Sequence, residues 1–129
     1  MDTEKTIGAI TWIDLTIPDA DAVRDFYKNV IGWKTMDVSM GEYNDYCMIS
    51  PEDNVVRSGV CHERGVNIGI PSAWIMYVNV ENLDASMDAV KSGGGEIVNG
   101  PRKMGDTSRY CIIKDPAGAY LGLFEHGDV

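Results

Sequence analysis

The sequence predicts an α+β protein in which one βαβββ module occurs twice. Two observations lead to this prediction: residues recur at a nearly constant offset, and each copy shows the same order of hydrophobic patterns. Alternating apolar residues predict strands with one buried face, and each copy has one segment with the three- and four-residue spacing of a helix. The 129 residues, 44% of them hydrophobic, suit one compact domain over 1–129.

The repeat consists of residues that recur 63 or 64 positions later. Tyr46 and Tyr110 lie 64 residues apart, and each is followed by cysteine. Further pairs with one of these two offsets are Gly41 and Gly105, Gly32 and Gly95, Ile17 and Val80, Asp19 and Asn82, and Gly59 and Gly122. An offset this constant indicates a duplication with small changes in loop length. On this alignment Tyr46 and Tyr110 occupy equivalent positions on the third strand of each copy.

The first copy spans 9–61. Residues 9–17 alternate between apolar and polar side chains, which predicts a strand. Asp19 or Asp21 can cap a following helix that ends at Gly32. The apolar residues of this helix form one stripe, which we expect to be buried: Val23, Phe26, Tyr27, Val30 and Ile31. Three shorter strands are expected at about 33–38, 44–50 and 55–61, parted by Gly, Asn, Pro and Asp.

The second copy spans 73–126 and repeats this order. We expect a strand at 73–80 and a helix at about 84–92. Three successive glycines follow this helix and end it. Strands are then expected near 96–99, 108–114 and 119–125. Residues 62–72, punctuated by Gly and Pro, read as the linker between the two copies.

Charge and composition exclude several classes of protein. A formal net charge of −9 with scattered Lys and Arg argues against nucleic-acid binding. We expect no membrane span and no signal peptide, because no long apolar stretch occurs and the start is polar. Cys47, Cys61 and Cys111 are odd in number and lack C-x-x-C spacing, which suits reduced thiols. The expected location is therefore the cytoplasm.

Three segments of the chain stand out: TIPDADAVRDFYKNVIGW, YVNVENLDASMDAVKSGGG and KDPAGAYLGLFE. Together they resemble the vicinal oxygen chelate superfamily, which includes glyoxalase I, bleomycin-resistance proteins and extradiol dioxygenases. The resemblance implies that the two modules form a curved, incomplete barrel around a cleft, with the helices outside. It also implies a homodimer.

Enzymes of that superfamily hold a divalent metal in the cleft, with one ligand from the first and one from the last strand of each module. The matching positions in this chain are Trp12, Gly59, Ile75 and Gly122, and none of these side chains has a lone pair that could coordinate a metal. We therefore expect no metal and no cofactor. A metal at the rim is the alternative, and solvated polar strand ends are the simpler interpretation of its candidate ligands: His62, Glu63, Glu125 and His126.

Without a metal, the cleft implied by the resemblance would be aromatic and apolar with a few polar groups. Period-two alternation predicts its ligand-binding residues: Trp12, Asp14, Thr16, Arg57, Cys61, Ile75, Tyr77, Asn79, Tyr120 and Phe124. Gly59 and Gly122 are expected to leave space among them. In the alternative interpretation these side chains fill the barrel themselves, and Asp14 pairs with Arg57.

The function expected from these patterns is that of a glyoxalase-like protein that binds a small molecule without a metal. An enzyme is the first alternative: a lactoylglutathione-lyase-like lyase or isomerase, or a dioxygenase type, using a displaced metal or acid/base chemistry centred on Asp14 with Tyr77. Asp14 is a weak catalytic candidate, and Cys61 as a nucleophile is weaker still. A structural homodimer without a ligand is the second alternative.

Overall fold

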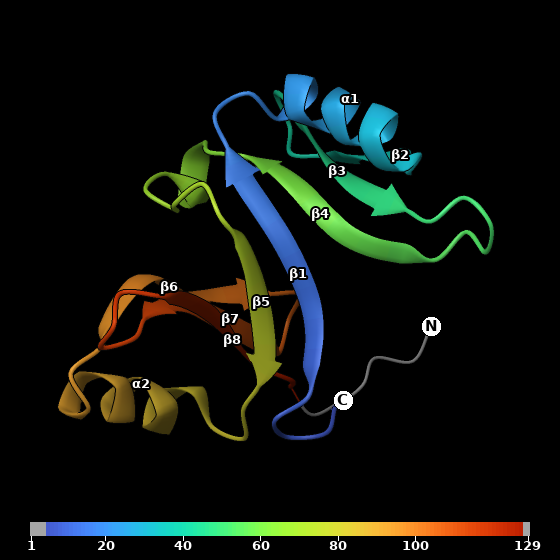
Figure 1. Cartoon of the computed structure of the whole chain (residues 1–129). Coiled ribbons are helices and arrows are strands. Elements are labelled where there is room, and N and C mark those ends of the chain that lie inside the picture. The colour runs from blue at the N-terminus through green and yellow to red at the C-terminus, as the bar shows by residue number, and fades with distance from the viewer. Residues whose placement is uncertain (1–4, 128–129) are drawn as a thin grey trace. The chain divides into compact units, whose positions relative to one another are not determined.

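A computed structural model describes residues 5–127, which hold eight strands, two α-helices and one 3₁₀ turn (Figure 1). The elements in chain order are β1 (Ile10–Ile17), α1 (Ala20–Ile31), β2 (Lys34–Ser39), β3 (Asn44–Ile49), β4 (Val56–His62), the 3₁₀ turn (Gly65–Asn67), β5 (Trp74–Asn79), α2 (Leu83–Ser92), β6 (Glu96–Met104), β7 (Ser108–Lys114) and β8 (Tyr120–Glu125). This order confirms the α+β class and the doubled βαβββ module.

The chain divides into two compact units. The first unit is Ile13–Trp74, and the second unit is formed by the described residues on both sides of it, 5–12 and 75–127. The N-terminal segment belongs to the second unit because it pairs with the end of β5. There the Gly8 amide donates to the Asn79 carbonyl at 2.8 Å, and the Asn79 amide donates to the Ala9 carbonyl at 2.9 Å.

Each unit pairs the first and last strand of its module in parallel. In the first unit the strand order is β2-β3-β4-β1, and Asp14 of β1 lies opposite Gly59 of β4. In the second unit the order is β5-β8-β7-β6, and Tyr77 of β5 lies opposite Gly122 of β8. Both residues of the second pair stand 63 positions after those of the first, which supports the duplication. Strand β2 has only β3 as a neighbour and β6 has only β7, so β2 and β6 are edge strands.

The third strands are not aligned as the sequence repeat predicts. Tyr46 pairs with Val60. Leu123, which stands 63 positions after Val60, pairs with Cys111. The structural counterpart of Tyr46 is therefore Cys111, and the predicted equivalence with Tyr110 is wrong. A shift of one residue turns a strand side chain to the other face.

Burial agrees with this corrected register. Tyr46 and Cys111 are both buried in the hydrophobic cores of their units. Tyr110 instead contacts the ring of Tyr77, with ring centroids 6.0 Å apart. The extra residues of the second copy lie before β7, since β6 is longer than β2 and its pairing with β7 shifts register twice.

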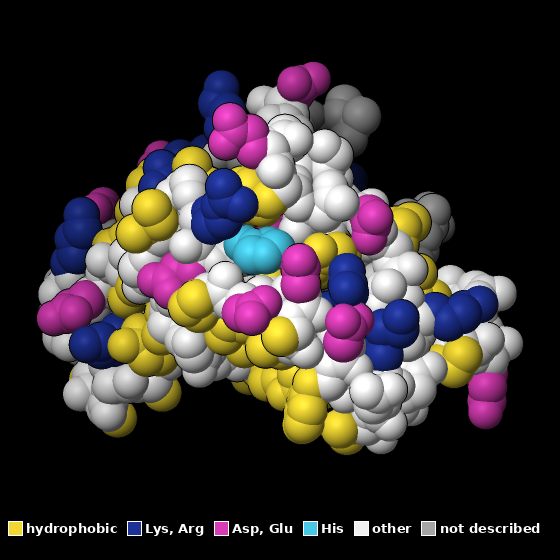
Figure 2. Space-filling model, turned by 90° about the horizontal axis from the view of Figure 1, so that it is seen from above, with side chains coloured by type: hydrophobic (Ala, Val, Ile, Leu, Met, Phe, Trp, Pro, Cys, Tyr) yellow, Lys and Arg dark blue, Asp and Glu magenta, His cyan; other side chains and the backbone are white. Residues whose placement is uncertain are grey.

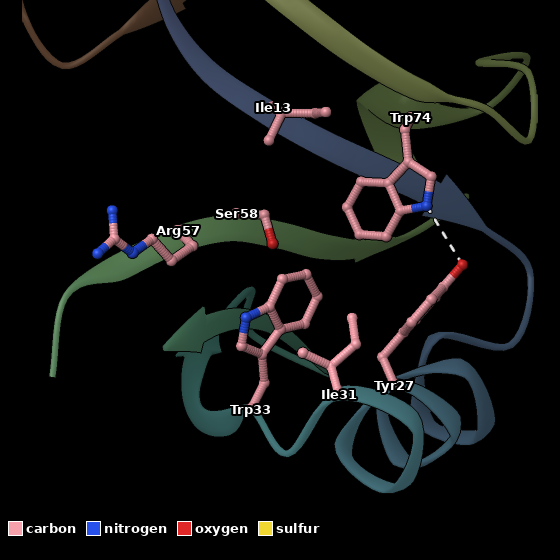
Figure 3. Close-up of a pocket in the computed structure, with 7 residues that line it drawn as sticks. All are labelled: Ile13, Tyr27, Ile31, Trp33, Arg57, Ser58 and Trp74. Atoms are coloured by element: carbon pink, nitrogen blue, oxygen red, sulfur yellow. Dashed lines mark hydrogen bonds between the residues drawn. The ribbon is translucent and has the colours of Figure 1, made fainter. Parts of the chain in front are cut away.

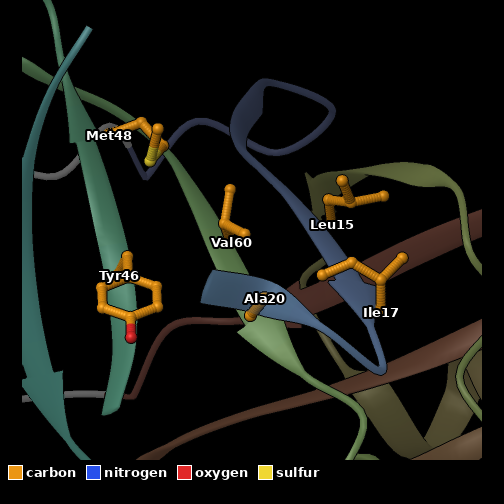
Figure 4. Packing of buried hydrophobic residues seen from close by; sticks show 6 residues of the cluster. All are labelled: Leu15, Ile17, Ala20, Tyr46, Met48 and Val60. Carbon is orange, nitrogen blue, oxygen red and sulfur yellow. The ribbon is translucent and has the colours of Figure 1, made fainter. Parts of the chain in front are cut away.

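Each unit has its own core against its helix. The core of the first unit, shown in Figure 4, is formed by Leu15, Ile17, Ala20, Tyr46, Met48 and Val60. The core of the second unit is formed by Leu83, Met87, Cys111, Ile113 and Leu123. Full burial of one such aliphatic side chain contributes about 1.5–3 kcal/mol.

Helix α1 begins where the sequence predicts. The Asp19 carboxylate accepts a hydrogen bond from the Ala22 amide at 3.1 Å, so Asp19 is the cap. The helix ends at Gly32, whose φ of +87° favours glycine. The expectation that the whole apolar stripe is buried is wrong: Phe26, Val30 and Ile31 are 57%, 62% and 50% exposed. Val23 and Tyr27 alone of the stripe pack against the core.

The surface mixes charges of both signs. On the face shown in Figure 2, Lys and Arg side chains lie among Asp and Glu side chains, and hydrophobic side chains reach the surface between them. Neither α1 nor α2 has the length and hydrophobicity that crossing a membrane requires.

Packing around Gly122 predicts a sensitivity to substitution. A Cβ atom at Gly122 would lie 2.3 Å from Cδ2 of Tyr77, far inside normal contact. We expect Gly122→Ala to lower the free energy of unfolding by about 1–3 kcal/mol, as measured by urea denaturation. In a Tyr77→Ala background the same change should cost much less, because the clashing ring is gone. An equal cost in both backgrounds would contradict this packing.

Candidate functional site

In the second unit, the predicted ligand-binding residues lie on the face of β5 and β8 that carries Tyr77 and Gly122, called the strand face below. Packing of side chains occupies most of this face. Tyr77 is 6% exposed, and its ring covers Gly122. The expectation that Gly122 leaves space is therefore wrong, because the side chain opposite it on β5 fills that space. Ile75, at a position that matches a metal ligand in the family pattern, is buried as well.

Asn79 connects three segments of the second unit. Its side-chain oxygen accepts a hydrogen bond from Thr11 Oγ1 at 3.2 Å and lies 3.1 Å from His126 Nε2. Its amide nitrogen donates to the Thr6 carbonyl at 3.2 Å. Asn79 is 1% exposed, and the hydrogen bonds of its side-chain amide hold these segments together. Of the other two predicted residues on this face, Phe124 packs on the His126 ring and Tyr120 lies near Lys114 Nζ.

In the first unit, the strand face carries Asp14, Thr16 and Cys61, with Thr16 opposite Cys61 across the parallel pair. Burial raises the pKa of the Cys61 thiol far above its usual range, and the carboxylates of Asp14 and Asp45 raise it further. The thiol therefore stays protonated at neutral pH. This opposes a role for Cys61 as a nucleophile, since the thiolate is the reactive form.

Arg57 does not pair with Asp14. Its Nη2 donates to Asp53 Oδ2 at 2.7 Å, and its Nε donates to Ser50 Oγ at 3.0 Å. The Asp14 and Arg57 ion pair of the alternative interpretation is therefore wrong. The guanidinium is half exposed at the turn that joins β3 to β4.

The residues present do not fit the divalent metal that the fold family implies. Trp12, Gly59, Ile75 and Gly122 offer no donor, and the Tyr77 ring covers Gly122. Among residues 5–127, no group of three or more His, Cys, Asp or Glu side chains is placed to hold a metal ion.

The residues of the alternative rim metal have other partners. Glu125 accepts a hydrogen bond from the Leu83 amide at 2.7 Å, and Glu63 accepts one from the Gly69 amide at 3.0 Å. The His62 amide donates to Asp45 Oδ1 at 2.8 Å, and its ring Nδ1 lies 3.4 Å from the same oxygen without a hydrogen bond. These contacts favour the simpler interpretation, in which the polar residues stabilise the ends of their strands.

A pocket lies within the first unit, between α1 and the strands β1 and β4. Its volume is about 500 Å³. Figure 3 shows the side chains that line it: Ile13, Tyr27, Ile31, Trp33, Arg57, Ser58 and Trp74. The wall is mainly apolar, and three of the seven side chains are aromatic. Ile31, which is half exposed, belongs to this lining.

The three aromatic side chains of the pocket hold one another in place. Tyr27 and Trp74 meet edge to face with centroids 5.4 Å apart, and Trp33 and Trp74 do so at 6.3 Å. Trp74 Nε1 donates a hydrogen bond to the Tyr27 hydroxyl at 3.2 Å, drawn as the dashed line in Figure 3. Such aromatic pairs contribute about 0.5–1.5 kcal/mol each beyond area burial.

Ser58 is the unusual polar group of this pocket. It lies on β4 and is 2% exposed, and its Oγ has no hydrogen-bond partner among the described residues. In Figure 3 its oxygen is directed toward the side of the pocket where Trp33 lies. A buried hydroxyl without a partner costs about 1–3 kcal/mol, and native proteins keep few of them.

The predicted ligand-binding residues share one member with this lining, Arg57, and the prediction put it in the cleft beside Gly59 rather than in this pocket. Tyr27 and Ile31 were expected in the buried stripe of α1. Trp74 stands near the start of the expected strand 73–80, and Trp33 stands at the start of the expected strand 33–38. These two tryptophans were the feature of the sequence that could have indicated the pocket. Whether they close over a core or border a gap depends on the distance between α1 and the sheet, which no sequence pattern reports.

Comparison with known proteins gives consistent matches. The family model described as the glyoxalase/bleomycin resistance protein/dioxygenase superfamily matches residues 9–123. CFP32 of Mycobacterium tuberculosis, which is named as a glyoxylase, is 32% identical over 124 residues. The anthracycline biosynthesis protein DnrV of Streptomyces peucetius is 28% identical over 131 residues. These alignments cover 95% and 93% of this chain and 48% of each relative, so the chain spans about half the length of the curated relatives it matches.

Solved structures with the same fold include a superfamily member from Vibrio splendidus, with a TM-score of 0.58 and 10% identity over 89% of this chain and 97% of that one. Another is a methylmalonyl-CoA epimerase from Streptomyces coelicolor in complex with 2-nitronate-propionyl-CoA. Its TM-score is 0.59 at 15% identity, over 96% of this chain and 98% of that one. At this identity the likeness concerns the fold alone.

The unsatisfied hydroxyl of Ser58 predicts that its removal stabilises the ligand-free protein. We expect Ser58→Ala to raise the free energy of unfolding by about 1 kcal/mol, and Tm by about 3–5 °C in calorimetry. Ser92→Ala on α2 is the matched control, since the Ser92 hydroxyl already donates to the Asp88 carbonyl at 3.0 Å. A clear loss of stability in Ser58→Ala would mean that the hydroxyl has a partner.

Proposed function

Because the chain belongs to the glyoxalase/bleomycin resistance protein/dioxygenase superfamily, we propose that it binds a small organic molecule without a metal ion, in the pocket of the first unit. The observation that carries this proposal is the pocket itself, with its three aromatic walls and the unsatisfied Ser58 hydroxyl. Small-molecule sites in proteins are concave and mainly apolar, with a few polar groups and volumes of about 300–1,000 Å³.

The names of relatives support a small organic molecule as ligand. One relative is named as a glyoxylase and another as an anthracycline biosynthesis protein, and both names refer to the chemistry of small organic molecules. Neither name identifies the compound that this chain binds. No geometry favours acid/base chemistry centred on Asp14, and the protonated Cys61 thiol opposes nucleophilic catalysis. Binding is therefore the function that the site supports best.

The remaining expectations stay predictions. One of them is that a ligand contacts the strand-face residues: Trp12, Asp14, Thr16, Cys61, Ile75, Tyr77, Asn79, Tyr120 and Phe124. The homodimer, which sedimentation equilibrium would decide, and the location in the cytoplasm are the others.

Ligand binding in the pocket predicts a fluorescence change that depends on particular tryptophans. We expect a compound from a metabolite library to quench Trp fluorescence and, at 100 times its Kd, to add about 2.7 kcal/mol of stability. Trp74→Phe and Trp33→Phe should remove most of the quenching, because both indoles line the pocket. Trp12→Phe serves as the control and should leave it intact. Quenching that disappears only in Trp12→Phe would place the ligand on the strand face.

The metal-free part of the proposal predicts that binding does not depend on divalent ions. Protein purified without chelators should contain far less than one equivalent of Ni, Zn, Mn or Fe by elemental analysis, and EDTA should leave ligand affinity unchanged. Stoichiometric metal, or affinity lost with EDTA and restored by one of these ions, would refute this part.

A further inference from the structure

We infer that the pocket of the first unit selects a flat ring system that carries a carbonyl or carboxylate oxygen, and that Ser58 and Trp33 donate hydrogen bonds to that oxygen. This inference rests on the proposed function and specifies its ligand. It follows from the shape of the walls and from the kind of polar groups they offer.

The walls favour a flat ligand. The rings of Trp33 and Trp74 are inclined to each other by 66°, and those of Tyr27 and Trp74 by 72°. A planar ring that enters among them can present its edge to one ring and its face to the next, as aromatic groups prefer. The aliphatic side chains of Ile13 and Ile31 complete an apolar surface for the same ring.

Several of the residues that line the pocket carry hydrogen-bond donors. Trp33 Nε1 has no partner among the described residues, and an indole N–H can only donate. The guanidinium of Arg57 on β4 likewise carries only donors. Tyr27 accepts the bond from Trp74, so its own proton remains available. Ser58 Oγ lacks a partner and can donate as well.

Acceptors are scarce in the same lining. None of the seven described lining residues carries a carboxylate, an amide or an imidazole side chain. The nearby carboxylate of Asp53 is engaged by Arg57 at 2.7 Å. A ligand that brings amine groups would find few acceptors and would meet the positive charge of Arg57, whereas a ligand oxygen would meet donors.

Ser58 gives the strongest selection because its hydroxyl has no hydrogen bond to lose. A ligand oxygen that accepts from it gains a bond and satisfies a buried polar group at once. The hydroxyl is buried on β4, and Ser58 belongs to the lining of the pocket that the ligand would enter. Trp33 follows Gly32 at the end of α1, and its ring contacts those of Tyr27 and Trp74 with centroids 6.2 and 6.3 Å apart.

The test compares two probes that differ in one group. 2-Acetonaphthone carries a ketone oxygen, and 2-isopropenylnaphthalene replaces that oxygen by a methylene of the same shape. Affinities are measured by calorimetry for the wild type, Ser58→Ala, Trp33→Phe and the control Ser92→Ala. We expect the wild type and Ser92→Ala to bind the ketone about threefold to tenfold more tightly than the alkene. Ser58→Ala should reduce that preference to less than about twofold, and Trp33→Phe should weaken it as well.

The outcomes separate this inference from the proposed function. Equal affinity for both probes in the wild type would overturn the inference and leave binding in the pocket intact. A ketone preference that survives in both Ser58→Ala and Trp33→Phe would also overturn it, because the donors would lie elsewhere. Failure of both probes and of every library compound to change Trp fluorescence would overturn the proposed function itself. A preference lost in Ser58→Ala while the alkene still binds supports the inference.

Discussion

Parallel pairing of the first and last strand of each module is the constraint on which the rest of the structure depends. Parallel neighbours need a long connection between them, and here the helix and the second and third strands supply it. The pairing sets Asp14 opposite Gly59 and Tyr77 opposite Gly122. It also decides which face of β1 and β4 lies toward α1, and that face carries both the core of the first unit and its pocket.

The two copies of the module use one scaffold in different ways. In the second unit the Tyr77 ring packs over Gly122, so the strand face is closed by a side chain from the next strand. In the first unit the equivalent strand position is Asp14, and the pocket lies on the opposite face, between α1 and the sheet. Duplicated modules can diverge in this way because side chains alternate between the two faces, so each face can change without altering the hydrogen bonds of the sheet.

Ser58 illustrates how a binding site can reduce stability. The hydroxyl is buried on β4 among aromatic and aliphatic side chains and forms no hydrogen bond to the described residues. Alanine would fit the same position without an unsatisfied group. A residue that costs stability is explained most simply by an interaction that forms only when the ligand is bound, since many stabilising changes at functional sites reduce function.

The sequence by itself determined the fold class, the doubled module, the cap at Asp19 and the lack of donor atoms at Trp12, Gly59, Ile75 and Gly122. These features depend on the spacing and identity of residues, which the sequence states directly. The tertiary structure alone decided that Cys111 rather than Tyr110 corresponds to Tyr46, that Tyr77 covers Gly122, and that a gap remains beside Ser58. The physical reason is that register and packing depend on distances between side chains far apart in the chain. A shift of one residue or a few ångströms changes them without changing any local pattern.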